Sequence, residues 1–140
     1  MDCLFCAIVA GDIPSRQVYA DAAAVAFLDI NPWKRGHTLV IPRRHVDDLL
    51  AADEALTEIA AAINATARLL VDRLGADGVN LLSSAGAVAG QEVFHLHVHL
   101  VPRYADDPGL RAVTDRVAGI DLDEVAAALA GAGSSGGAGR

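Results

Sequence analysis

The stretch FHLHVHLV, residues 94–101, decides the fold and the chemistry that we expect of this 140-residue chain. Apolar residues alternate with histidines along it, which is the pattern of a β-strand with two different faces. We expect His95, His97 and His99 to share one face of a strand that spans residues 93–101. Neighbouring histidines would then lie about 6.6 Å apart, since a strand rises roughly 3.3 Å per residue. Three of the chain's five histidines on one strand face indicate a functional site rather than an incidental polar surface.

Two chemistries fit such a row of histidines. The imidazoles could bind zinc, because neighbouring histidines can converge on one ion, although the outer two are separated by about 13 Å of strand. Alternatively, one neutral imidazole is a nucleophile whose tautomer is fixed by its neighbours, since its pKa lies near neutrality. The loop of residues 86–91 favours the second reading. Its small residues let backbone N–H groups approach a ligand and bind phosphate oxygens.

The remaining sequence predicts an α+β domain with an antiparallel sheet of about five strands, one long helix and several short helices. Apolar residues at three- and four-residue steps predict the long helix over residues 53–74, with Asp53 as N-cap and Gly75 as the residue that ends it. The other expected strands are residues 18–19, 25–30, 38–41 and 79–82, and the short helices are residues 4–10 and 121–129. We expect one domain over residues 1–130 and a disordered tail, rich in Gly, Ala and Ser, over residues 131–140.

Composition excludes several classes of protein. The net charge of −7 argues against a protein that binds double-stranded nucleic acid, which needs a basic face. No apolar run approaches the roughly 20 residues of a membrane span, and the N-terminus lacks the pattern of a secretory signal, so we expect a cytoplasmic protein. A local basic cluster still allows a small phosphate ligand; it consists of Lys34, Arg35, Arg43 and Arg44.

The segment GQEVFHLHVHLV, residues 90–101, resembles the signature of the histidine-triad (HIT) nucleotide-binding superfamily, His-φ-His-φ-His-φ-φ. The similarity also includes residues 5–14, 27–32 and 36–45, and it covers roughly residues 3–104. It implies a HIT-like fold that pairs as a homodimer, with the long helix and a strand edge at the interface.

The resemblance also implies a nucleotide hydrolase or nucleotidyl transferase. His97 would attack the α-phosphate of an AMP-like purine nucleotide and form a nucleotidyl-histidine, while His99 contacts the phosphate and His37 holds the triad in place. Gln91 and the loop N–H groups would stabilise charge on the phosphate, and Asp29 would accept the ribose hydroxyls. The implied nucleotide-binding residues are Phe5, Ile8, Ile13, Phe27, Asp29, Ile30, Ser84, Gly90, Gln91, Glu92, Val93, His97 and His99. For the apolar members of this set, ordinary core packing explains the sequence equally well.

Two positions depart from the branch of the family that hydrolyses phosphoramidates. Ser84 stands where that branch has asparagine, and Glu92 stands where it has a serine that assists the leaving group. A carboxylate near the phosphates could repel the substrate, or could donate a proton if its pKa is raised. The substrate class therefore stays open between dinucleoside polyphosphates, nucleoside phosphoramidates and related nucleotides. A nucleotide-binding partner protein with little turnover and a zinc hydrolase are the alternatives.

Cys3 and Cys6 have the C-x₂-C spacing that supplies half of a tetrahedral zinc site. The resemblance to bacterial relatives with such a pair implies that His45 and His95 complete it. Four protein ligands leave no open position, so this zinc would be structural. A reduced pair and a redox dithiol are the alternatives, although a redox motif usually opens a helix after a strand, and none is expected before Cys3.

Overall fold

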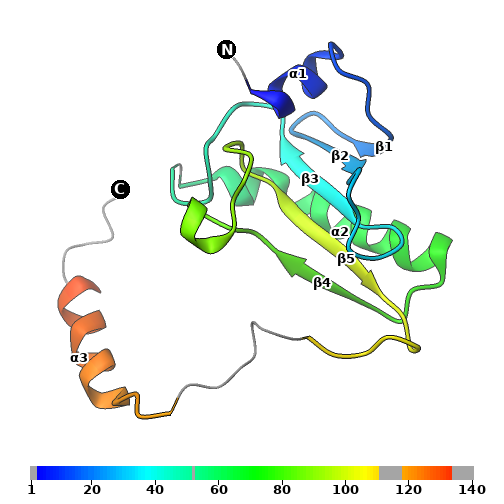
Figure 1. Cartoon of the computed structure of the whole chain (residues 1–140). Helices are drawn as coiled ribbons and strands as arrows, with labels where there is room; N and C mark the ends of the chain where they lie inside the picture. The colour runs from blue at the N-terminus through cyan, green and yellow to red at the C-terminus, as the bar shows by residue number, and fades with distance from the viewer. Residues whose placement is uncertain (1–2, 52, 111–117, 134–140) are drawn as a thin grey trace.

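The computed structural model describes residues 3–51, 53–110 and 118–133 (Figure 1). Its elements are α1 (Leu4–Ala10), β1 (Gln17–Ala20), β2 (Ala24–Leu28), β3 (Thr38–Pro42), α2 (Ala55–Leu74), β4 (Gly78–Leu82), the 3₁₀ turn η1 (Ala87–Ala89), β5 (Val98–Arg103) and α3 (Leu122–Gly133). The strands form one antiparallel sheet in the order β1-β2-β3-β5-β4. The predicted α+β architecture with five antiparallel strands is confirmed.

The two faces of the sheet carry two separate apolar clusters. Figure 1 shows α2 running behind the sheet, where Ile59 and Leu70 of the helix pack with Val40, Val98 and other small and branched residues of the strands. Residues that alternate with these point to the opposite face, where residues of β2 and β3 pack against α1. This second face carries the candidate site.

Helix α2 begins two residues later than its amphipathic pattern predicts. Glu54, rather than Asp53, is the N-cap, and no side chain there accepts a capping hydrogen bond. The C-terminal prediction is confirmed, because Gly75 has a left-handed φ of 69° and its N–H donates to the carbonyl of Val71.

The fifth strand is shorter at its start than predicted. It begins at Val98 rather than residue 93, because the backbone N–H of Leu96 donates to the carbonyl of Val46, in the loop after β3, instead of to a ladder partner. The prediction that three histidines share one strand face was therefore wrong. The second strand also ends early, at Leu28, since the side chain of Asp29 accepts the N–H of Asn31 in a local turn.

The C-terminal helix is longer than predicted. The carboxylate of Asp121 accepts the N–H groups of Asp123 and Glu124, as expected of an N-cap, and α3 continues to Gly133 instead of ending near residue 129. The first three residues of the expected tail thus belong to α3, and residues 134–140 lie outside the described residues. Among the described helices, none has both the length and the apolar character that a membrane span requires.

Gly36 and Gly75 allow a paired test of backbone strain and packing. Both have positive φ values, 89° and 69°, but a Cβ at position 36 would lie 2.4 Å from Leu74 Cδ1 and 3.1 Å from Pro102 Cγ, whereas at position 75 nothing lies within 4 Å. Gly75→Ala should therefore lower the free energy of unfolding by about 1 kcal/mol through strain alone. Gly36→Ala should lose somewhat more, up to about 1 kcal/mol beyond this, because the end of the Leu74 side chain must move aside and Pro102 Cγ is close. Urea unfolding measures both, and equal losses would contradict the packing explanation.

Candidate active site and metal centre

The environment of His97 fixes which of its nitrogens is free. Its Nδ1 lies 2.8 Å from the backbone carbonyl of His95, and a carbonyl can only accept, so Nδ1 carries the proton. In the neutral ring the lone pair is then on Nε2. The side chain is buried, and the ring of Phe5 packs perpendicular to it at a centroid distance of 5.2 Å. These contacts hold the ring in the tautomer that a histidine nucleophile requires.

The neighbouring histidines form a chain of hydrogen bonds. The backbone N–H of Trp33 donates to His37 Nδ1 over 3.0 Å, so neutral His37 carries its proton on Nε2. That Nε2–H donates to His99 Nδ1 over 2.9 Å, which places the proton of His99 on its own Nε2. The rings of His97 and His99 lie 5.0 Å apart. The site therefore pairs a nitrogen lone pair with an adjacent N–H donor.

Burial lowers the pKa values of His99 and His37. It lowers the pKa of His99 to about 4, with further contributions from the positive charges that His97 and His37 would carry. Burial also lowers the pKa of His37, although the carboxylate of Asp29, 3.6 Å from His37 Nε2, acts in the opposite direction. At neutral pH the hydrogen-bond chain thus exists in its uncharged form.

This shift predicts how stability depends on pH. Between pH 6.5 and about 4 the unfolded chain binds a proton at His99 that the folded protein excludes, so stability falls as the pH is lowered through this range. The loss attributable to His99 should be roughly 1–3 kcal/mol. Urea unfolding of the wild type and of His99→Asn at several pH values measures it as a difference in slope. Parallel curves for the two proteins would refute the assignment.

Trp33 covers the chain of histidines and was missed by the sequence analysis. Its ring is stacked on His99 at 4.7 Å, with 16° between the planes, and lies over His37 at 4.5 Å. More than half of the side chain, 55%, remains exposed. In the sequence, only its position four residues before His37 could have indicated that Trp33 lies near the site.

The loop before the histidines is braced by Gln91. The side-chain oxygen accepts the N–H of Gly86, and the side-chain nitrogen donates to the carbonyls of Asp47 and Val93. The amide of this buried side chain is thus occupied by backbone groups, which differs from the phosphate contact expected of it. Gly86 and Gly90, with φ values of 96° and 103°, give the loop its shape.

Two serines precede this loop in the chain. Ser83, which the sequence analysis missed, donates to the backbone carbonyl of His97. Ser84 is half-buried, with its Oγ 3.8 Å from where a Cβ of Gly90 would be, and Glu92 is exposed.

The structure brings together only part of the expected apolar wall. Phe5 and Phe27 are buried and touch edge to face, and Ile8 and Val93 pack against the same cluster. The side chains of Ile13 and Ile30 are 37% and 81% exposed and do not belong to this cluster.

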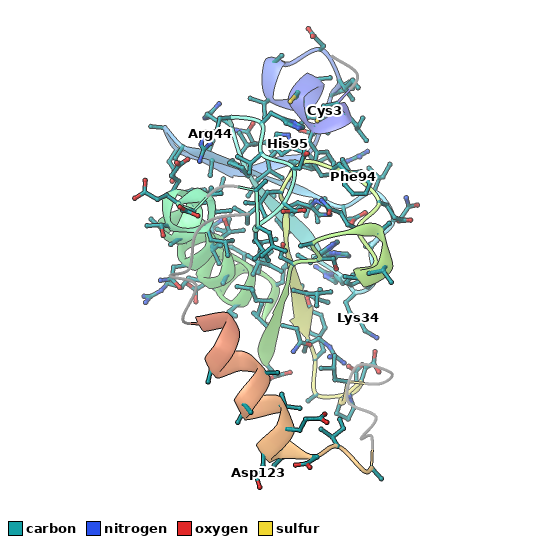
Figure 2. All side chains as sticks on the ribbon, turned by 90° about the vertical axis from the view of Figure 1, so that its left-hand side faces the viewer. Cys3, Lys34, Arg44, Phe94, His95 and Asp123 are labelled. Carbon is teal, nitrogen blue, oxygen red and sulfur yellow. The ribbon has the colours of Figure 1, made fainter. Side chains whose placement is uncertain are left out.

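The four expected metal ligands meet at one point, although they come from α1, the loop after β3 and the segment before β5. Cys3 Sγ lies 3.4 Å from His95 Nδ1, and Cys6 Sγ lies 3.4 Å from His45 Nδ1 and 3.5 Å from His95 Nδ1. All four ligand atoms lie within 4.8 Å of one another. A tetrahedral zinc ion with bonds of about 2.3 Å to sulfur and about 2.1 Å to nitrogen gives S···N edges of about 3.6 Å. Figure 2 shows Cys3 and His95 close together at this end of the sheet.

A hydrogen bond from Nε2 of each ring orients both histidines toward the thiols. His95 Nε2 donates to the carbonyl of Pro42, and His45 Nε2 to the carboxylate of Asp47. Each neutral ring therefore presents the lone pair of Nδ1 to the cysteines, which is the arrangement that metal-binding histidines use. The four residues fit a closed zinc site.

A second group of metal-ligand atoms, from Asp29, His37 and His99, also lies within 4.8 Å. A metal there would need the lone pair of His37 Nε2. That nitrogen carries the proton, because His37 Nδ1 accepts from Trp33. This group fits a hydrogen-bond chain better than a metal site.

Comparison with known proteins agrees with this geometry. Residues 10–106 match the family described as the HIT domain. An uncharacterized HIT-like protein of Methanocaldococcus jannaschii is 45% identical over 125 residues, which cover 88% of this chain and 95% of the relative. A crystal structure from Streptococcus mutans superposes with a TM-score of 0.83 at 43% identity, covering 96% of this chain and 84% of that one. The adenylylsulfatase HINT3 of Arabidopsis thaliana is 36% identical over 91% of this chain and 66% of its own length. The chain therefore belongs to the HIT domain family.

Proposed function

We propose that this protein is a nucleotide hydrolase or nucleotidyl transferase that acts at the α-phosphate of an AMP-like purine nucleotide through a nucleotidyl-histidine on His97. One observation carries the proposal. The hydrogen bond from His97 Nδ1 to the carbonyl of His95 leaves the lone pair on Nε2, next to the N–H of His99.

The reaction proceeds in two displacements at phosphorus. The lone pair of His97 Nε2 forms a bond to phosphorus as the bond to the leaving group breaks, and the leaving group departs with the electron pair and takes up a proton. The Nε2–H of His99 donates to a phosphate oxygen and stabilises the charge that develops there. The carbonyl of His95 stabilises the positive charge of the nucleotidyl-imidazolium. Water then attacks phosphorus, the bond to His97 Nε2 breaks with its electron pair returning to the ring, and the nucleoside monophosphate leaves while the proton of the water passes to solvent. Another acceptor that attacks in place of water would leave with the nucleotidyl group attached to it.

With the α-phosphate between His97 and His99, the other parts of the nucleotide would contact the residues around these histidines. Phe5, Ile8, Phe27 and Val93 would pack on the base, and the carboxylate of Asp29 would accept the ribose hydroxyls. Ile13 and Ile30 would contact the base only from the rim, since their side chains are exposed. The N–H groups of Gly86, Ala89, Gly90 and Gln91 donate to acceptors inside the loop. Phosphate oxygens would therefore be bound by the other backbone N–H groups of the loop, those of residues 87 and 88, with Ser84, Gly90, Gln91 and Glu92 as the flanking residues.

Zinc is a structural part of this proposal. Cys3, Cys6, His45 and His95 would hold it, and it would supply a fixed crosslink between α1 and the segment that carries His97. Zinc binding by Cys3 and Cys6 would agree with a cytoplasmic location. Paired cysteines in a reducing compartment more often bind metal than form a disulfide.

A homodimer through the edge of the sheet and the long helix is also proposed. Strand β4 is an edge strand, and exposed apolar side chains on it and on α2 support such an interface. They are Leu81, Leu56 and Val71, with exposed fractions of 58%, 38% and 37%.

AMP release from three adenylyl substrates tests the proposed function: diadenosine tetraphosphate, an adenosine phosphoramidate and adenosine 5′-phosphosulfate. The third is included because the Arabidopsis relative is named an adenylylsulfatase. We expect turnover of at least one. AMP binding without any turnover would instead identify a nucleotide-binding partner protein. Turnover that a chelator stops at once, before the protein unfolds, would identify a metal hydrolase.

A further inference from the structure

A pocket of about 640 Å³ lies on the α2 side of the sheet, on the face opposite the histidines. Its wall is largely apolar, because Val18 of β1 and Leu70 and Leu74 of α2 line it as part of the cluster between the helix and the sheet. Its described lining contains two charged residues, Arg35 and Arg73, and no carboxylate. The pocket therefore combines apolar surface with positive charge, outside the proposed nucleotide site.

The two arginines come from different walls of this pocket. Arg35 lies in the loop after β2, and Arg73 lies in the last turn of α2. Both side chains are exposed, and neither forms an ion pair with another described residue. In a chain with a net charge of −7, two unpaired cations beside an apolar pocket favour a partner that carries carboxylates next to apolar side chains.

Helix α3 has the complementary pattern. Leu122 and Val125 are three residues apart and so lie on one side of the helix, where their side chains are 77% and 41% exposed. Asp123 and Glu124 flank this apolar pair on its two sides, since successive residues of a helix are about 100° apart. The first turn of α3 thus presents an apolar pair between two carboxylates.

The described part of the chain leaves α3 uncovered. Every residue from 118 to 128 is exposed, and Figure 1 shows α3 apart from α2 and from the sheet. Figure 2 shows Asp123 at the end of α3 that points away from the domain. An isolated helix of 12 residues is marginally stable in water, so α3 gains from a surface that covers its apolar side. Because α3 is held away from its own domain, a second molecule is the source of that surface.

We propose that α3 of one copy of this chain binds in the pocket of a second copy. Leu122 and Val125 pack on the apolar wall, and the carboxylates of Asp123 and Glu124 pair with the two arginines. This exchange of helices goes beyond the proposed dimer through the sheet edge, because it adds a contact at a different surface of the domain.

The bound helix also packs behind the loop that carries the histidine chain. Arg35 and Gly36 line the pocket and directly precede His37 in the sequence. In the same loop, the backbone N–H of Trp33 donates to His37 Nδ1. The second copy therefore braces the loop that sets the tautomer of His37, whatever reaction the site catalyses.

Amide hydrogen exchange of α3, followed by mass spectrometry at increasing protein concentration, tests the proposal. In the wild type, exchange in α3 should slow at least about tenfold as the concentration passes the dissociation constant of the dimer measured by sedimentation. Two pairs of charge reversals should each abolish this protection. They are Arg35→Glu with Arg73→Glu in the pocket, and Asp123→Lys with Glu124→Lys in the helix.

Arg16→Glu with Arg68→Glu is the matched control. It makes the same change of charge as the pocket variant, at two exposed arginines outside the pocket, and should leave the protection of α3 within about threefold of the wild type. All the substituted side chains are exposed, so each variant should fold.

A mixture of the two charge-reversed variants shows whether α3 binds to another copy. Protection should return in the mixture, because the native helix of one variant fits the native pocket of the other, and the reversed helix fits the reversed pocket. Protection of wild-type α3 that is independent of concentration, protection that survives the charge reversals, or a mixture without recovery would overturn the proposal. Rapid exchange of α3 in a wild-type dimer would also overturn it, and would leave the dimer through the sheet edge standing.

Discussion

His97→Ala is expected to lower the turnover of an adenylyl substrate by roughly 10⁴-fold or more, with AMP affinity changed by no more than a few-fold. The side chain supplies the atom that bonds to phosphorus, so its removal eliminates the covalent route rather than weakening one contact. Binding should persist because the proposed base and ribose contacts come from other elements, Phe5 in α1 and Asp29 after β2. Steady-state AMP release and calorimetry with AMP measure the two effects separately.

A trapped intermediate makes this prediction specific. Wild-type protein quenched during turnover should carry one adenylyl group on the peptide that contains His97, detectable by mass spectrometry. His99→Ala is the matched control, since it removes the proposed N–H donor but keeps the nucleophile, and it should slow turnover by about 10²–10³-fold while the adduct still forms. An adduct on another residue, or full turnover by His97→Ala, would end the nucleophile hypothesis.

The histidine segment shows how far a sequence pattern reaches. Alternation along residues 94–101 predicts that its four apolar residues enter a core, and this is confirmed for Leu96, Val98 and Leu100. It was wrong for Phe94, which is 48% exposed, and for the one face predicted for three histidines. Each ring is instead oriented by a different contact. His95 contacts the cysteines, His97 donates to a backbone carbonyl, and His99 accepts from the ring of His37. These partners are fixed by tertiary contacts. Spacing along one strand carries no information about them.

The apolar character of a residue also does not determine whether it contacts the base. Phe5 and Phe27 were expected near the base and do meet in one cluster, whereas Ile30, predicted for the same wall, is exposed because β2 ends before it. Trp33 and Ser83 were missed because a ring stacked on His99 and a hydroxyl bonded to the His97 carbonyl produce no periodic signal.

The metal ligands illustrate the opposite case. The C-x₂-C spacing predicts half of a site locally, while His45 and His95, 39 and 89 residues beyond Cys6, were placed by family resemblance alone. The structure brings all four ligand atoms within 4.8 Å.

Removal of the metal should cost both stability and turnover. We expect untagged protein to contain one zinc ion per chain, and Cys6→Ser to lose it together with at least about 3 kcal/mol of folding free energy, because metal binding is linked to folding. Asp47→Ala is a graded control, since it keeps all four ligands and the backbone carbonyl that Gln91 contacts, and removes the side-chain acceptor for His45 Nε2. It should weaken zinc binding by about 10–100-fold. Metal analysis and thermal unfolding test these effects, and unchanged zinc content in Cys6→Ser would refute the site.

The loss of turnover should follow the loss of structure, because one residue connects the two sites. The ring of His95 contacts both cysteines, and its carbonyl holds the proton on His97 Nδ1. If the expected zinc is removed, the segment of residues 95–97 should lose its anchor, and the orientation of His97 and the position of its free lone pair should no longer be fixed. Activity and near-ultraviolet circular dichroism should therefore decay together after a chelator is added. Activity that vanished while the dichroism stayed constant would mean that the metal takes part in the chemistry, and the assignment of His97 as the nucleophile would then fail.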